Sequence, residues 1–474
     1  MTTWSRYRPS PRADDEHPVG VTGLTRHPRR TAAVLLAVSL VAVACGSGNG
    51  NSGAHNSTTT AGQTTTTGGK PSGSGGSGGS INVGVIGPMT GPAAEIGTLM
   101  TAACATGVYA VNRAGGPLGN KLKCDVIDDT GDPADAVPNV TRALATTSNL
   151  DMAVGLESNT AATTIPIVNR AHIPMFSTDG LVSFDKTTDQ YFWRMTPADN
   201  QNGAAFAIWA IRQGWKRAAM IFQNNIGAQG NEPGVVAAYA KLGGDLALKL
   251  TIPGDAASYS SIVQKVINAH PQALIFSADP QTSATFFSEY KQLNNGTVPP
   301  IVTATDSLTP DYYGAVEKVL GQQFVTHDIA LVGSYINPGT TAYKVYKHNL
   351  YSAPGIKSPG TVLGVGVISS IYDGIIIMSL AMQMAHSTKG PVYNADILKI
   401  TSAGSGKAVV HTYPAALAAL KAGHAIQYVG VGGAISFDQY HNSPGNYSAG
   451  AFTSGGSSRL LGVIKGTAVQ HALS

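Results

Sequence analysis

The chain has 474 residues, which is enough for two or three domains and for at least one large apolar core. Only 12% of the residues are charged and glycine occurs 56 times, so the surface must depend on uncharged polar side chains, and a small disulfide scaffold is excluded. From residue 45 onward the chain has 25 lysines and arginines and 24 acids, so it is nearly neutral. The lysines and arginines form no basic run interleaved with aromatics, which argues against nucleic-acid binding.

Residues 1–44 are predicted to be an export signal. A basic stretch that ends at Arg30 precedes an apolar run from Thr31 to Ala44, and this run is too short to span a bilayer of about 30 Å. The run ends at Cys45 in a pattern that resembles a bacterial lipoprotein box, in which the cysteine is lipidated and becomes the first residue of the mature protein. Cleavage near Ala44 as an ordinary secretory signal is the alternative.

Residues 45–80 are predicted to be a flexible tether. After Cys45 the segment consists mainly of Gly, Ser, Thr and Asn, and it has no large apolar side chains that could pack. Such a segment cannot offset the entropy lost on ordering. The predicted layout is therefore a lipid anchor, a tether and a globular head that starts at Ile81.

A first series of strands and helices follows from residue 81. Apolar runs that end in Gly or Pro predict strands, and apolar positions at helical spacing predict the helices between them. The predicted elements are a strand at INVGVIG, a helix at Thr98–Asn112, a strand at KLKCDVIDD, a helix at Asp135–Thr147, a strand at Met152–Val154, a helix from about Thr160, and a strand at Pro174–Ser177. This alternation predicts a parallel sheet covered on both faces.

A second series of the same kind follows residue 196. Its predicted elements are a helix at Asn200–Gln213, a strand at Arg217–Phe222, a helix at 232–242, a strand at 246–250, a helix at 258–268, a strand at Ala273–Phe276, a helix at 281–293, and a strand at Pro300–Thr303. The predicted fold class is therefore α/β, with two doubly wound lobes in succession.

Two stretches in the first series, VGVIGPMTGPAAEIG and NRAGGPLGNKLKCDVIDDTGDPADAV, carry a family resemblance. They resemble the amino-terminal signature of the periplasmic leucine/isoleucine/valine-binding protein family, the type I solute-binding proteins of ABC importers. The order of elements agrees from Ile81 to about Gly466. The resemblance implies two parallel-sheet lobes that are joined by three crossing segments and close over a ligand.

The resemblance also implies the lobe boundaries. Lobe 1 takes residues 81–198 and 333–445, and lobe 2 takes residues 199–332 and 446–474. Hinges are expected near Pro197, Gly333 and Gly445, because small or turn-forming residues absorb backbone rotation.

Ser158, Asn159 and Thr160 are the first candidate ligand-binding residues. They follow the strand at Met152–Val154 and begin a helix, and a helix N-terminus favours an anion such as an α-carboxylate. By resemblance, Ser158 matches the serine that holds the ligand carboxylate. The alternative is that Ser158 or Thr160 only caps the helix.

Thr178 and Asp179 follow the next strand. The resemblance places ligand contacts here, and this chain aligns Asp179 and Leu181 with positions that use a backbone carbonyl and a threonine hydroxyl. Asp179 could meet a ligand ammonium, or it could only form a turn.

The second lobe is expected to contribute acids. Asp279 aligns with a position that is often aromatic, and Asp306 aligns with the acid that binds the α-ammonium, for which charge-assisted hydrogen bonds are suited. The alternative for Asp306 is a helix N-cap before Leu308. Where the relatives have a tyrosine, this chain has Asn225, Ile226 and Gly227, which are expected to offer a smaller apolar wall, so the ligand need not be leucine.

Cys104 and Cys124 both fall in the first strand-helix-strand unit. Export permits a disulfide between them, and two buried thiols are the alternative. The bridge that the family usually has finds no counterpart, because Gly131 and Glu157 occupy those positions.

The function predicted from these features is capture of a small polar ligand, an amino acid of the branched-chain type or a related amide. The resemblance implies an ABC permease as partner, and we expect a monomer held by its lipid on the outer face of the cell membrane, with no cofactor. A lipoprotein that senses a ligand for a signalling receptor would have the same cleft. We expect no catalytic and no metal site, because the sequence has no HExxH, CxxC or GxSxG motif.

Overall fold

The computed structural model describes residues 79–146, 150–443 and 445–474. The chain divides into two units, Met1–Gly73 and Ser74–Ser474, and the described residues all belong to the second. The predicted signal, the lipidation of Cys45 and nearly all of the predicted tether lie outside the described residues.

The first large sheet is parallel throughout and has the strand order β2-β1-β3-β4-β5. Its strands are β1 (Ser80–Gly87), β2 (Lys121–Asp128), β3 (Leu150–Gly155), β4 (Met175–Ser177) and β5 (Phe192–Arg194). The connecting helices are α1 (Ala94–Arg113), α2 (Pro133–Thr146) and α3 (Ser158–Arg170), with 3₁₀ turns η1 (Pro117–Gly119) and η2 (Val182–Phe184). These strands are rich in buried Val and Ile, as expected when helices cover both faces.

The second large sheet has the order β15-β14-β10-β9-β8-β6-β7. Its strands are β6 (Arg217–Gln223), β7 (Asp245–Ile252), β8 (Ala273–Ser277), β9 (Ile301–Ala304), β10 (Ile329–Ser334), β14 (Tyr447–Phe452) and β15 (Ser458–Ile464). Strands β6 to β10 are parallel, whereas β14 and β15 add an antiparallel hairpin at the β10 edge. The helices of this half are α4 (Asp199–Arg212), α5 (Ile226–Gly230), α6 (Glu232–Lys241), α7 (Ser260–Asn268), α8 (Pro280–Leu293), η3 (Thr305–Ser307), α9 (Pro310–Leu320), α10 (Gln322–Asp328) and α17 (Gly466–Leu473).

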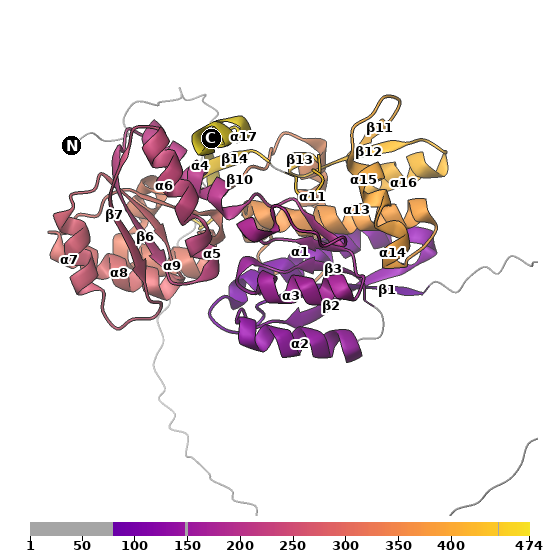
Figure 1. Ribbon diagram of the computed structural model, residues 1–474, viewed down its shortest axis with the longest axis horizontal. Coiled ribbons are helices and arrows are strands. Elements are labelled where there is room, and N and C mark those ends of the chain that lie inside the picture. Colours follow the sequence, from indigo (N-terminus) through magenta and orange to yellow (C-terminus); the bar gives the residue numbers. More distant parts are fainter. Residues whose placement is uncertain (1–78, 147–149, 444) are drawn as a thin grey trace, which may run out of the picture. The chain divides into compact units, whose positions relative to one another are not determined.

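The segment between β10 and β14 adds helices and a small sheet to the first half. It contains α11 (Thr341–Ser352), α12 (Pro359–Gly364), η4 (Gly366–Ile368), α13 (Ser369–Ala385), α14 (Gly390–Tyr393), α15 (Asp396–Thr401), β11 (Ala408–Val410), α16 (Tyr413–Lys421), β12 (Ile426–Gly430) and β13 (Gly433–Ala434). Helix α13 packs against α1, β3 and β4, and the sheet β11-β12-β13 lies beyond it (Figure 1).

The prediction of an α/β fold with two parallel-sheet lobes is confirmed by the two large sheets. The chain passes from one half to the other after β5, after β10 and after β13. Pro197 lies between β5 and α4, Gly333 lies inside β10, and Gly445 lies between β13 and β14. The lobe boundaries themselves stay a prediction.

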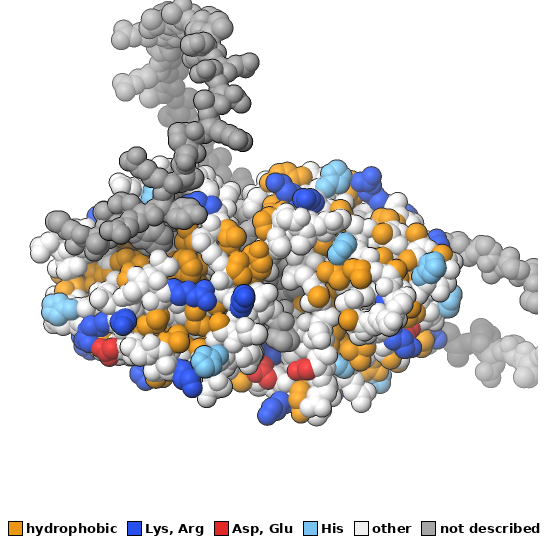
Figure 2. Space-filling view, turned by 90° about the horizontal axis from the view of Figure 1, so that it is seen from above, with side chains coloured by type: hydrophobic (Ala, Val, Ile, Leu, Met, Phe, Trp, Pro, Cys, Tyr) orange, Lys and Arg blue, Asp and Glu red, His pale blue; other side chains and the backbone are white. Residues whose placement is uncertain are grey.

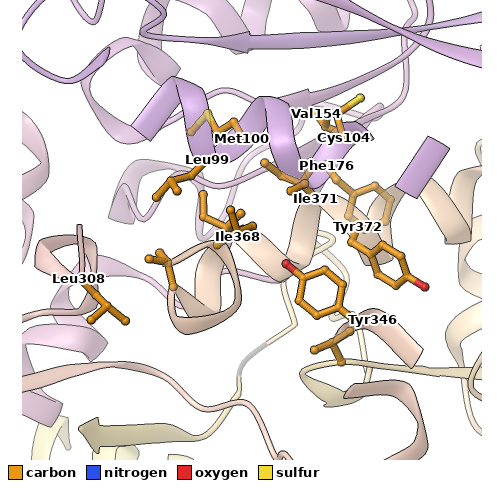
Figure 3. Packing of buried hydrophobic residues seen from close by; sticks show 14 of the residues in the cluster. Leu99, Met100, Cys104, Val154, Phe176, Leu308, Tyr346, Ile368, Ile371 and Tyr372 are labelled. Atoms are coloured by element: carbon orange, nitrogen blue, oxygen red, sulfur yellow. The ribbon is translucent and has the colours of Figure 1, made fainter. Parts of the chain in front are cut away.

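Helix α13 is the centre of the core in the first half. Its side chains meet those of α1, β3 and β4 in the cluster drawn in Figure 3, which includes Met100, Val154, Phe176, Ile371 and Tyr372. Burial of a side chain of this size stabilises the folded state by about 1.5–3 kcal/mol. Among the described residues, Ala94–Arg113 and Gly366–Ala385 are long and apolar enough to cross a membrane. The most apolar stretch of the second is 83% buried in the protein, however, as in a core helix.

A disulfide joins Cys104 on α1 to Cys124 on β2, with the two Cα atoms 6.3 Å apart. It fastens the first helix to the edge strand of the first sheet. On the face shown in Figure 2, charged side chains are scattered among uncharged polar and apolar ones, in keeping with the low charge content of the chain.

Candidate functional site

A cavity of about 380 Å³ lies at the carboxyl ends of strands from both large sheets. Its walls include residues that directly follow β1, β3 and β4 of the first sheet and β8 and β9 of the second. In open parallel sheets this is the edge at which ligands bind. The volume falls in the range of small-molecule sites.

The N-terminus of α3 forms part of the first wall. The Glu157 carboxylate accepts hydrogen bonds from the Asn159 backbone N–H at 3.0 Å and from Asn159 Nδ2 at 3.1 Å, so Glu157 caps the helix. Ser158 Oγ accepts from the Gly180 N–H at 2.9 Å, which leaves its hydroxyl proton free to donate. Glu157, Ser158 and Asn159 all line the cavity, and the cap considered for Ser158 or Thr160 is made by Glu157 instead.

Thr160 does not reach the cavity. Its side chain is fully buried, and its hydroxyl donates to Asp129 Oδ2 at 2.7 Å. Thr160 points away from the cavity because it lies on the side of α3 that faces the loop after β2. Its role in the structure is to join that loop to α3.

Asp179 is also away from the cavity. It is fully buried, it faces the guanidinium of Arg194 at 3.4 Å, and it accepts hydrogen bonds from the Ser177 hydroxyl and the Leu181 N–H. Burial raises the pKa of Asp179, while the Arg194 charge lowers it. Arg194 also pairs with Asp185, so Asp179 belongs to a buried ionic cluster and not to the ligand wall.

Three more of the predicted residues line the cavity, namely Thr178, Asp279 and Asp306. The Thr178 hydroxyl donates to the Gly155 carbonyl at 3.2 Å. Asp279 caps α8, since its two carboxylate oxygens accept from the backbone N–H and the hydroxyl of Thr282, each at 2.8 Å. Both side chains therefore already have partners within the protein.

Asp306 differs from these two residues. Its side chain is exposed to the cavity and has no hydrogen-bond or ion-pair partner among the described residues. The side chain is accessible, but the surrounding walls partly desolvate it, and this raises its pKa. A carboxylate in this condition is suited to an ammonium group of a ligand.

Three further acids, Glu95, Asp199 and Asp311, line the cavity but were not among the predicted residues. Burial raises the pKa of Asp199 well above its ordinary value, and the charges of Asp179 and Asp306 add to this effect. Asp199 begins α4 two residues after the expected hinge at Pro197, and this was the sequence signal that could have identified it.

The two halves touch beside the cavity. The Gly227 N–H of α5 donates to Asn159 Oδ1 of α3 at 3.3 Å. On the side of α1, burial raises the pKa of Glu95 and the charge of Asp311 adds to the rise, whereas hydrogen bonds with the Thr309 side chain and the Asp311 backbone lower it. Asn225 and Gly227 line the cavity, whereas Ile226, which was expected in the same wall, does not line it and is exposed.

An apolar wall completes the cavity. Ile96 and Met100 of α1 and Val367 and Ile368 of η4 contribute to it. Met100 and Ile368 also belong to the packed cluster in Figure 3, so this wall is held by the core of the first half. The cavity therefore offers both carboxylates and alkyl groups to a ligand.

The model of a family described as "Periplasmic binding protein" matches residues 80–357, which is more than half of the chain. The chain belongs to this family. A curated relative, "Leu/Ile/Val-binding protein homolog 3" of Brucella melitensis biotype 1, is 26% identical over 200 residues, which are 41% of this chain. The match spans about half (54%) of the length of that relative.

Solved structures show the same fold. The substrate-binding protein LivJ of Streptococcus pneumoniae, in complex with isoleucine, has a TM-score of 0.65 at 15% identity, covering 81% of this chain and 99% of that chain. A leucine-binding protein LivK of Thermotoga maritima has a TM-score of 0.64 at 17% identity, with coverages of 81% and 99%. A solute-binding protein of R. palustris, in complex with benzoate, has a TM-score of 0.62 at 17% identity, with coverages of 81% and 96%.

The recognition of a type I periplasmic binding protein is thus confirmed. The family and the structural neighbours are solute-binding proteins and not enzymes. No group of three or more His, Cys, Asp or Glu that could hold a metal ion is found within residues 79–146, 150–443 and 445–474.

Proposed function

We propose that this chain is the extracytoplasmic solute-binding lipoprotein of an ABC importer, and that it captures a small polar ligand with an ammonium group. The observation that carries the proposal is the cavity, which both halves of the protein line and where Asp306 has no partner within the protein. The ligand class first expected is an amino acid, of the branched-chain type, or a related amide. The family and the isoleucine bound in the LivJ structure support it.

The proposed mechanism is capture followed by closure. The ligand binds first to one lobe of an open cleft, and closure about the three crossing segments adds the contacts of the other lobe. Exclusion of water strengthens each polar contact in the cavity. The closed head then docks on a membrane permease, and we expect it to act as a monomer.

Ligand screening tests the proposal directly. A thermal-shift screen of the purified head, residues 79–474, across amino acids, amides, ureas and amines should find a ligand that raises the melting temperature. Asp306→Ala should then weaken binding of that ligand about tenfold or more, because a charge-assisted hydrogen bond is lost. Asp135→Asn, at an exposed carboxylate on α2 outside the cavity, is the matched control.

Two results would count against the proposal. If no compound of these classes shifts the melting temperature, the proposed ligand class is wrong. If a ligand is found and Asp306→Ala binds it with unchanged affinity in isothermal titration calorimetry, Asp306 does not belong to the site.

Membrane anchoring through Cys45 is a separate part of the proposal. Its support is the apolar run that ends at Ala44, directly before Cys45. Cys45→Ala should move the protein from the membrane fraction to the medium in cells that express the full chain. An unchanged membrane fraction would refute lipidation at this residue. Loss of uptake of the identified ligand on deletion of the gene would distinguish transport from sensing.

A further inference from the structure

The charged side chains of the cavity wall are all acidic. Six acids line the cavity, whereas none of the described residues that line it is Lys, Arg or His. The acids are Glu95, Glu157, Asp199, Asp279, Asp306 and Asp311. The surface elsewhere does not share this bias, because the chain from residue 45 onward has nearly equal numbers of acids and bases.

Two of these carboxylates have an oxygen without a partner. Glu157 Oε1 and Asp199 Oδ2 are shielded from solvent, and neither has a hydrogen-bond partner among the described residues. Asp199 is packed so closely that a Cβ added to Gly180 or Gly230 would overlap its carboxylate. Shielded acceptors without donors are costly, and a positive charge bound in the cavity would offset part of this cost through space.

The acids also face one another across the cleft. Glu95 and Glu157 belong to the first half, and each is affected by the charge of a carboxylate of the second half, Asp311 for Glu95 and Asp306 for Glu157. Asp129 of the first half has the larger effect on Glu157. Closure therefore brings like charges together, which disfavours the charged forms of both. A bound cation would offset this repulsion.

The place where a ligand carboxylate would bind is already occupied. The N-terminus of α3 was the predicted cradle for an α-carboxylate, but the Glu157 carboxylate accepts the Asn159 N–H there. A second carboxylate at this helix end would have to compete for that donor and would lie next to Glu157. The expected anion subsite of a zwitterion is thus weakened, because the Asn159 N–H is taken and the Ser158 hydroxyl is what remains there to donate.

We infer that the ligand of this cavity is a compact organic cation with a net positive charge, an alkylamine or a diamine, and not a neutral zwitterion. The inference rests on the proposed function and narrows its ligand class. The ammonium binds among Asp306, Glu157 and Asp199, and the alkyl part lies against Ile96 and Met100. This apolar wall is the reason why an organic cation fits better than a metal ion.

Four matched probes test the inference. Norleucine is a zwitterion, pentylamine is norleucine without its carboxylate, lysine is norleucine with a second ammonium, and cadaverine is lysine without its carboxylate. Isothermal titration calorimetry at pH 7 should give a Kd for pentylamine at least tenfold lower than that for norleucine, and cadaverine should bind most tightly.

Variants of the wall provide a second measurement. Glu157→Gln should reduce the preference for pentylamine over norleucine by about tenfold, since glutamine cannot release a proton and become the charge partner of a bound cation. Asp306→Asn should also reduce the preference for pentylamine over norleucine. It replaces Glu157→Gln as the test if Glu157→Gln does not fold. Asp135→Asn should leave the preference unchanged.

The outcomes separate this inference from the proposed function. If norleucine binds as tightly as pentylamine and lysine, the inference is overturned and the proposed function stands. If the preference for pentylamine is present but insensitive to both cavity variants, the inference is overturned too, because the selectivity then lies elsewhere. If none of the four probes and no member of the wider amino acid and amide panel binds, both are overturned.

Discussion

Glu157→Gln should stabilise the protein at neutral and alkaline pH. Burial, together with the charges of Asp129 and Asp306, raises the pKa of Glu157 to about 8 from the ordinary 4.5. Between these two values the folded protein holds a proton that the unfolded chain has lost. The free energy of unfolding therefore falls as the pH rises through this window, and above about pH 8 the full penalty is present.

The structure sets the size of this effect. The two pKa values are about 3.5 units apart and each unit corresponds to about 1.4 kcal/mol, so the ceiling is about 5 kcal/mol. Water entry and relaxation of the cavity wall reduce such penalties, and we expect a gain on the order of 2 kcal/mol at pH 8.5. Glutamine keeps the cap of α3, because its Oε1 can accept from the Asn159 N–H as the carboxylate does.

Thermal denaturation of the wild type and of Glu157→Gln from pH 5 to pH 9, followed by circular dichroism, measures the effect. The difference in melting temperature should be smallest at pH 5 and should grow toward pH 9 in favour of the variant. Acids elsewhere titrate in both proteins, so the difference isolates this carboxyl. A difference that is constant with pH, or a variant that is less stable at pH 8.5, would refute the reasoning.

The remaining predictions concern stability. Arg194→Met should lower the free energy of unfolding by about 3–5 kcal/mol, because Asp179 would remain as an uncompensated buried charge, and adding Asp179→Asn should restore part of the loss in urea unfolding. Cys104→Ser should cost about 3 kcal/mol, and dithiothreitol should lower the melting temperature of the wild type but not of this variant. Gly234→Ala should lower the melting temperature measurably, because its Cβ would overlap the Asn200 carbonyl oxygen between α4 and α6; an unchanged value would contradict that close approach.

Much of the fold was predictable because its signals are local. Apolar strands alternate with helices of regular spacing from β1 to β9, and each period can be read within 10 to 20 residues. The small sheet β11-β12-β13 was not predicted, since β11 has three residues and β13 has two, too few to show a period. The antiparallel hairpin β14–β15 was missed for a different reason, because its pairing partner β10 lies more than a hundred residues earlier.

The site was predictable to the level of strand ends but not of single side chains. The carboxyl ends of β3, β4, β8 and β9 brought Ser158, Thr178, Asp279 and Asp306 to one cavity. Which neighbour points inward depends on helix phase and on distant partners, neither of which is visible in a short stretch. Asp179 illustrates this, because the partner that removes it from the wall, Arg194, lies 15 residues later on another strand.

The closed arrangement and the charge of the ligand are linked through the acids of the two halves. The hydrogen bond from Gly227 to Asn159 is of a kind that contributes about 0.5–1.5 kcal/mol, whereas moving a two-state equilibrium from 1:99 to 99:1 takes about 5.5 kcal/mol. Closure also brings the like charges of Glu157 and Asp306 into interaction. A ligand that binds both carboxylates turns this repulsion into attraction in the closed state alone. Differential affinity of that kind is what shifts a conformational equilibrium, so the acids can serve as the trigger of closure as well as the basis of selectivity.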